Sequence, residues 1–189
     1  LVKGIGMMYG DNLYFKSYPS FSANISKVKN DLYKLEYLIG FIPDIIVIDF
    51  PDVLAPEDRR VIGRDRIDET WKTLKNLGDE RRCMVVTASQ SNRAGIGKKS
   101  LGQIDIAEDI RKLAHVDLMF TLNQKKDEKK KNIMRVGVIG ARDEDFDENR
   151  QVMILQQLAV GQPLLDSEIV EFSMDDDDDK KSKKSSKSK

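Results

Sequence analysis

The pattern of hydrophobic and polar residues predicts helices that alternate with strands in the first part of the chain. Residues 24–39 place their apolar side chains on one helical face, and Gly40 follows as a helix stop. Residues 65–77 repeat this pattern with Trp71 on the apolar face, where a core position is favoured over an exposed ligand platform. A helix that leads into an apolar strand is half of an α/β repeat.

The most apolar predicted strand is residues 44–50. Four consecutive β-branched residues lead directly into Asp49: Ile45, Ile46, Val47 and Ile48. Such a run predicts a strand that is buried on both faces, as in a parallel sheet covered by helices. A carboxylate at the carboxyl end of this strand would lie at the edge where open α/β sheets bind ligands, where it could hold Mg²⁺. The alternative is that Asp49 only caps the turn before Pro51, and the strand alone leaves both interpretations open.

The rest of the chain predicts shorter elements. Further strands are predicted at 12–17, 83–88, 117–122, 134–139 and 151–158, with an extension at 168–172. The pair at 134–139 and 151–158 is joined by a polar turn and predicts an antiparallel hairpin. A short helix is predicted at 104–114, ending at His115, and the lysine-rich residues 125–132 are predicted to form a solvated turn.

Composition adds limits on class and location. The chain has 189 residues with 32 Lys+Arg and 32 Asp+Glu, so its net charge favours neither nucleic acid nor membranes as partners. No apolar run reaches membrane-spanning length, and without a signal peptide a cytoplasmic location is expected. We expect residues 1–172 to form one domain and residues 173–189, a run of Asp followed by Lys and Ser, to be a disordered tail. Because the sequence begins with Leu1, a fragment or a processed product is one explanation.

Polar side chains gather where predicted strands end. Asp49 ends one strand, Gln90 follows the strand at 83–88, and Arg142 follows the first strand of the hairpin. In an oligomeric NTPase, an acid organises Mg²⁺ and the attacking water, a neighbouring polar side chain senses the γ-phosphate, and an arginine from the next subunit stabilises transition-state charge.

On these residues, the chain resembles the carboxyl-terminal part of the RecA-like ATPase domain of DnaB-type replicative hexameric helicases, especially phage versions. The resemblance covers roughly residues 12–165. It rests on four stretches: Pro43–Phe50 with Asp52-Val53-Leu54; Val86–Arg93, which contains Ser89-Gln90-Ser91-Asn92-Arg93; Ile106–Asp109 through Ala114–Asp117; and Ala141-Arg142-Asp143. It implies an α/β fold with a RecA-like, mostly parallel sheet flanked by helices and a C-terminal antiparallel hairpin.

The resemblance also implies roles for residues. Asp49 would be the Walker B acid that binds Mg²⁺ and ATP, Gln90 would couple nucleotide state to DNA binding, and Arg142 would be an arginine finger acting in trans. The loop 93–103 would face a central channel and bind single-stranded DNA through four residues: Arg93, Lys98, Lys99 and Ser100. The implied partners are single-stranded DNA and other subunits of a ring, in the cytoplasm of a bacterial or phage-infected cell.

The chain departs from the family pattern at the phosphate-binding half. No Gly-x-x-x-x-Gly-Lys-Ser/Thr motif occurs, and Gly97-Lys98-Lys99-Ser100 only partly matches one. The strand for the family's catalytic glutamate is also absent, and Gly140 stands where a basic residue is expected. We therefore expect no ATP hydrolysis by this chain alone. Three interpretations stay open: an ATPase module that needs a P-loop-bearing partner, a non-catalytic RecA-like module for DNA binding or assembly, and a generic α/β domain.

Overall fold

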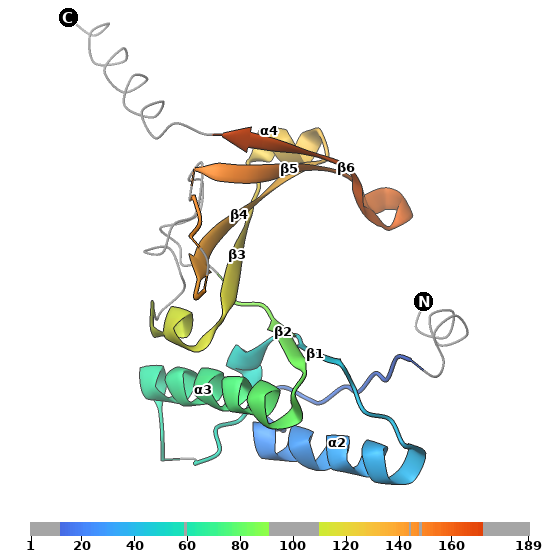
Figure 1. Ribbon diagram of the computed structural model, residues 1–189, viewed down its shortest axis with the longest axis vertical. Coiled ribbons are helices and arrows are strands. Elements are labelled where there is room, and N and C mark those ends of the chain that lie inside the picture. The colour runs from blue at the N-terminus through green and yellow to red at the C-terminus, as the bar shows by residue number, and fades with distance from the viewer. Residues whose placement is uncertain (1–11, 59, 91–109, 144, 148, 172–189) are drawn as a thin grey trace, which may run out of the picture. The chain divides into compact units, whose positions relative to one another are not determined.

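The computed structural model describes residues 12–58, 60–90, 110–143, 145–147 and 149–171 (Figure 1). The chain divides into two compact units, Leu1–Ala88 and Ser89–Lys189. Each unit has its own sheet, a two-stranded one with the order β1-β2 and a four-stranded one with the order β3-β4-β5-β6. No helix among these described residues is long and apolar enough to cross a membrane.

The first unit packs two long helices on a parallel strand pair. Its elements are α2 (Ile25–Ile39), β1 (Ile45–Ile48), the 3₁₀ helix η1 (Pro51–Val53), α3 (Gly63–Arg81) and β2 (Met84–Thr87). Helix α2 begins at Asn24, whose side chain accepts a 3.0 Å hydrogen bond from the backbone N–H of Lys27. It ends at Gly40, whose φ of 68° favours glycine. The predicted helix and its stop are therefore confirmed.

The core of the first unit lies between the two helices and one face of the strand pair. The buried cluster contains residues from both helices, from β1 and from the loop after η1: Ile25, Ile46, Leu54, Leu74 and Leu77. Val85 of β2, the parallel partner of Ile46, packs against it. Trp71 is buried, which confirms its predicted core position.

Two strand predictions in this unit are wrong. The strand at 44–50 is not buried on both faces, because Ile45 and Val47 are exposed and only the face that carries Ile46 packs on the helices. Residues 13–19 form no strand. A side-chain contact holds this segment against α2 instead, because the Tyr18 hydroxyl donates a 2.5 Å hydrogen bond to Asp31.

The second unit is an antiparallel sheet with short helices. Its elements are η4 (Ile110–His115), β3 (Leu118–Asn123), α4 (Lys126–Lys130), β4 (Ile133–Ala141), β5 (Arg150–Gln157), η5 (Leu158–Val160) and β6 (Gln162–Glu171). The predicted hairpin is confirmed as β4 and β5. The helix predicted at 104–114 lies largely outside the described residues, and its described end is the 3₁₀ helix η4.

Two further predictions in this unit change. The lysine-rich segment 125–132 is not a simple turn, because it contains the helix α4. The extension at 168–172 is part of the longer strand β6. This strand admits Pro163 because it lies at the edge of the sheet, where one set of backbone groups needs no partner strand.

One face of this sheet carries buried polar side chains. Arg135 of β4 is buried, and its Nε atom donates a 2.8 Å hydrogen bond to Glu128 Oε1 of α4. Its Nη1 atom donates to Gln151 Oε1 of β5 at 2.9 Å. Thr121 and Asn123 of β3 are buried on the same face and are hydrogen-bonded to each other. A buried charge of this kind is tolerated only when it is paired and hydrogen-bonded.

Candidate functional site

Asp49 follows β1 directly and lies at the carboxyl edge of the parallel pair. Its neighbour Ile48 pairs with Thr87 of β2, and the Thr87 hydroxyl donates a 2.6 Å hydrogen bond to the Ile48 carbonyl. Asp49 itself is exposed and makes no side-chain hydrogen bond or ion pair within the described part of the chain. Its carboxylate is therefore available to a ligand at this edge of the sheet.

The loop after Asp49 is held by helix α3. Arg66 Nη1 donates hydrogen bonds to the carbonyl oxygens of Asp52 and Leu54, at 3.2 and 3.1 Å. The indole N–H of Trp71 donates to Asp52 Oδ1 at 3.4 Å. These contacts fix η1 and so restrict the chain that leaves Asp49. The apolar periodicity of the sequence does not predict these contacts, although a buried tryptophan N–H usually needs a polar partner.

Asp49 suits Mg²⁺ better than a metal that needs a full set of protein ligands. Among the described residues, no three His, Cys, Asp or Glu side chains form a group that could hold a metal ion. Mg²⁺ usually keeps several waters and is bound by one or two carboxylates together with substrate phosphates. A single exposed carboxylate fits that role, with phosphate and water oxygens as the remaining ligands.

Gln90 lies in the second unit, after the end of β2, and its side chain is exposed. The preceding residue, Ser89, is anchored by Lys112 of η4, whose Nζ atom donates a 2.8 Å hydrogen bond to Ser89 Oγ. Lys112 is only 1% exposed, which is unusual for a lysine without a strong structural role. The contact ties η4 to the start of the Ser89–Arg93 stretch. Sequence pattern does not predict it, because the two residues are far apart in the chain.

Arg142 follows β4 directly and is exposed. Its Nη1 atom lies 3.3 Å from Asp117 Oδ1, and its Nη2 atom donates a 3.0 Å hydrogen bond to the Ala114 carbonyl. The backbone N–H of Arg142 also donates to the Asp117 carbonyl at 2.9 Å. The side chain is thus held at the end of the sheet by the segment between η4 and β3.

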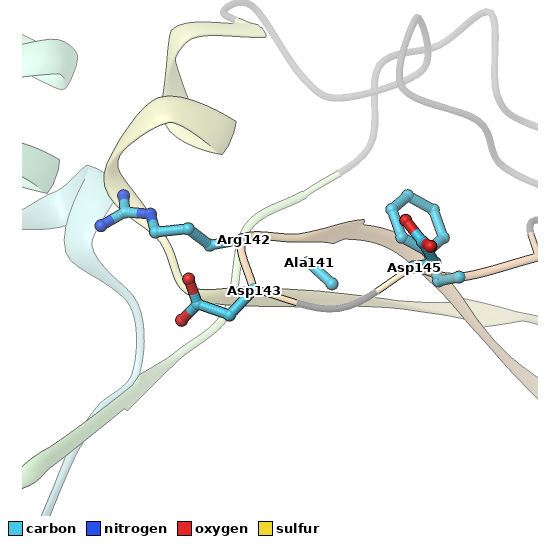
Figure 2. Close-up of a pocket in the computed structure, with 5 residues that line it drawn as sticks. Ala141, Arg142, Asp143 and Asp145 are labelled. Atoms are coloured by element: carbon cyan, nitrogen blue, oxygen red, sulfur yellow. The ribbon is translucent and has the colours of Figure 1, made fainter.

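An open recess of about 590 Å³ lies beside Arg142. It is lined by five residues of the β4–β5 connection: Ala141, Arg142, Asp143, Asp145 and Phe146. Figure 2 shows Arg142 and Asp143 extending to the same side, away from Asp145. Two carboxylates in the lining make the recess itself a poor site for phosphate. Arg142 is therefore better suited to bind a phosphate outside this recess than one inside it.

Gly140 of β4 lies close to the Leu113 side chain of η4. A Cβ atom added at this position would come within 2.7 Å of Leu113 Cδ2 of η4. A larger residue would therefore require the end of the Leu113 side chain to move.

The candidate residues are divided between the two units. Asp49 belongs to the first unit, whereas Gln90 and Arg142 belong to the second. The predicted tail at 173–189 and the loop predicted to bind DNA lie outside the described residues, and with that loop the four residues assigned to DNA: Arg93, Lys98, Lys99 and Ser100.

No protein-family model and no curated protein sequence matches this chain. Solved structures share its fold, and two of them are compared with it below. The ATPase domain of G40P superposes with a TM-score of 0.62 at 18% identity, over 80% of this chain and 52% of that chain. A DnaB-like replicative helicase, described with its interactions with primase, superposes with a TM-score of 0.60 at 19% identity, over 72% of this chain and 34% of that chain.

The chain thus spans about half the length of the first structure and about a third of the second. At these identities the likeness establishes the fold and leaves the chemistry to the residues themselves. The predicted RecA-like α/β fold class is confirmed, because this chain shares its fold with the ATPase domain of G40P and with a DnaB-like replicative helicase. Of the described strand pairs, however, only β1–β2 is parallel, whereas the prediction was a mostly parallel sheet.

Proposed function

We propose that this chain is part of the RecA-like ATPase module of a replicative DNA helicase and acts with a P-loop-bearing half that is supplied from outside these 189 residues. The observation that carries this proposal is the position of Asp49, an exposed carboxylate at the carboxyl end of a strand in a parallel pair. In α/β sheets this edge is where ligands bind. The likeness to helicase ATPase domains supports a nucleotide as that ligand.

In this proposal Asp49 is the Walker B acid and binds Mg²⁺, directly or through water, next to ATP. Asp49 would hold the ion, and a bound Mg²⁺ would supply positive charge that favours phosphoryl transfer. Gln90 would couple the nucleotide state to the DNA-binding loop. The phosphate cradle itself, with its lysine, would come from the P-loop-bearing half.

Arg142 serves in this scheme as a finger for the nucleotide of a neighbouring subunit in a ring. Its present partner Asp117 has a side chain that is 57% exposed, so the ion pair between them is weak and costs little to break. An arginine that can exchange an exposed carboxylate for a phosphate fits action in trans.

The proposed polymer substrate is single-stranded DNA, bound by Arg93, Lys98, Lys99 and Ser100 in the channel of the ring. Lysine and arginine bind its phosphates without regard to sequence. We place the protein in the cytoplasm of a bacterial or phage-infected cell.

A second candidate is a non-catalytic RecA-like module that binds DNA or serves assembly. The observation that favours it is the absence of a Walker A motif from the 189 residues. It differs from the first proposal in needing no nucleotide.

A mixing experiment separates the two. The purified chain is combined with the Walker A-bearing polypeptide from the same source, and ATP hydrolysis is measured with and without single-stranded DNA. Activity that appears only in the mixture supports the ATPase module. A mixture that stays inactive while the chain binds DNA supports the non-catalytic module.

Variants then test the roles. Arg142→Ala is expected to lower the turnover of the mixture by about 10³-fold or more, the range seen for arginine fingers, while Asp49→Asn abolishes its Mg²⁺-dependent activity. Arg150→Ala is the matched control, because Arg150 is also an exposed arginine at a strand end of the second unit. Unchanged turnover for Arg142→Ala would refute the finger role.

A further inference from the structure

The strand pair of the first unit leaves one face uncovered. Ile45 pairs with Met84 and Val47 with Val86, so these four side chains share one face of the sheet. They are 52%, 55%, 69% and 41% exposed, respectively. We call these four residues the bare face. Both α2 and α3 contribute to the core on the opposite face, with Ile46.

A bare face of this kind is not an ordinary solvent surface. It carries four apolar side chains and no polar one. Parallel strands occur almost only where both faces of the sheet are covered by helices. Contiguous exposed apolar residues on a folded protein mark sites of interaction.

The second unit independently shows the same imbalance. Four apolar side chains share one face of its sheet by register, and all are exposed: Phe120, Leu122, Val152 and Ile169. The opposite face holds the buried polar network of Arg135. This is the reverse of a sheet that faces water, because the polar face is buried and the apolar face is exposed. Among the described residues, each sheet therefore has an apolar face that its own unit leaves exposed.

We propose that the bare face is the docking surface for the P-loop-bearing half of the ATPase module, which lays the apolar side of a helix across it. This inference rests on the proposed function, because it names the surface that binds the P-loop-bearing half which the proposed function requires. Two observations identify the occupant. The match covers 80% of this chain but only 52% of the G40P ATPase domain chain, so an equivalent of the unmatched part of that fold is needed to complete the module. The strand that carries Ile45 and Val47 also leads directly to Asp49, so a partner seated there lies beside the proposed Mg²⁺ ligand.

The test measures binding of the purified Walker A-bearing polypeptide from the same source to variants of the full chain. Val47→Asp and Val86→Asp place a charge on the bare face, and each is expected to raise the dissociation constant about tenfold or more, as determined by calorimetry. Ile62→Asp is the matched control. It puts the same charge on an apolar residue that is 76% exposed and lies outside the bare face, and it should leave the affinity unchanged. Equal affinity for all variants, or no binding by the unaltered chain, would overturn the inference.

A second measurement holds even where an aspartate variant fails to fold. In a Cys83→Ala background, Val47→Cys supplies one exposed thiol, since the chain has a single native cysteine. Alkylation of this thiol should slow about tenfold or more when the partner is added, because docking excludes the reagent. An Ile62→Cys control should react at the same rate with and without the partner. If the partner binds and the Val47→Cys variant is still alkylated at its original rate, the inference is wrong.

The two proposals fail in different ways. Binding that depends on Val47 without any ATP hydrolysis keeps the docking surface and removes the ATPase role. Hydrolysis in a mixture whose binding ignores Val47 and Val86 keeps the ATPase role and removes the docking surface.

Discussion

Glu128 in α4 and Arg135 in β4 form an ion pair on the polar face of the antiparallel sheet, with Arg135 Nε 2.8 Å from Glu128 Oε1. The arginine side chain is 1% exposed and the glutamate side chain 19%. Glu128 Oε2 also accepts a 2.6 Å hydrogen bond from the backbone N–H of Lys125. One carboxylate therefore caps the start of the helix and neutralises a buried charge in the sheet.

Glu128→Gln is expected to lower the free energy of unfolding of the second unit by about 2–4 kcal/mol, because it leaves the Arg135 charge buried without its counter-ion. Urea unfolding followed by far-ultraviolet circular dichroism measures the change. Asp127→Asn, at an exposed position of the same helix, should shift it by less than about 0.5 kcal/mol. A similar small shift for both variants would show that the ion pair contributes little.

Leu77→Ala tests the core of the first unit. Leu77 has an exposed fraction of 0%, and its truncation should cost about 2–5 kcal/mol of unfolding free energy. Trp71 is the only tryptophan, so its fluorescence during urea unfolding reports this unit selectively. Leu38→Ala is the control, because Leu38 of α2 is exposed and its truncation should be nearly neutral. Equal losses for the two variants would contradict the assigned core.

Asp31 should make the first unit sensitive to acid. Lys16 Nζ lies 2.6 Å from its carboxylate, and hydrogen bonds from Lys16 and Tyr18 hold the pKa of Asp31 below its ordinary value of 3.8. A lowered pKa stabilises the folded state above pH 3.8, and this contribution is lost as the pH falls through the folded pKa. The Asp31→Asn variant should therefore be less stable than the native chain at pH 7. The loss is at most about 1 kcal/mol, because Lys16 is exposed and solvent weakens the pair.

The measurement for Asp31 is the stability difference between the native chain and Asp31→Asn across pH 7 to pH 2. That difference should shrink on acidification. Tyr18→Phe, which removes only one of the hydrogen bonds to the carboxylate, should show a smaller effect of the same sign. A difference that stays constant with pH would contradict the assigned role of the charge.

Lys98→Ala combined with Lys99→Ala should weaken binding of single-stranded DNA and flatten its dependence on salt. Each lost phosphate contact lowers the slope of log K against log salt by about 0.7 for a single strand. Lys129→Ala combined with Lys130→Ala removes the same charge from exposed positions of α4 and should leave the slope unchanged. Equal slopes for the two double variants would remove the proposed DNA loop.

The sequence predicted the two long helices because their apolar residues follow a helical period and Gly40 marks an end. It predicted that Asp49 and Arg142 follow strands, because both positions can be read from where an apolar run stops. It wrongly predicted burial of both faces at residues 44–50. An apolar run indicates a strand that can be buried, but it does not show whether another segment covers each of its faces.

The supporting contacts were not predictable in the same way. Lys112 with Ser89, and Arg66 with the loop after Asp49, join residues that are distant in sequence and carry no periodic signal. The run of charged residues at 125–132 predicts a solvent-exposed turn. Its helix is instead stabilised by a glutamate that caps α4 and pairs with a buried arginine, a contact that only the folded sheet provides.

The close packing at Gly140 has a mechanical consequence. Three consecutive residues of η4 each make a separate contact. Lys112 binds the hydroxyl of Ser89, Leu113 lies beside Gly140, and the carbonyl of Ala114 accepts a hydrogen bond from the Arg142 side chain. The Leu113 side chain fills the space beside Gly140, between these two flanking contacts. A substitution that displaces η4 would therefore be expected to disturb the contacts of Ser89 and of Arg142 together.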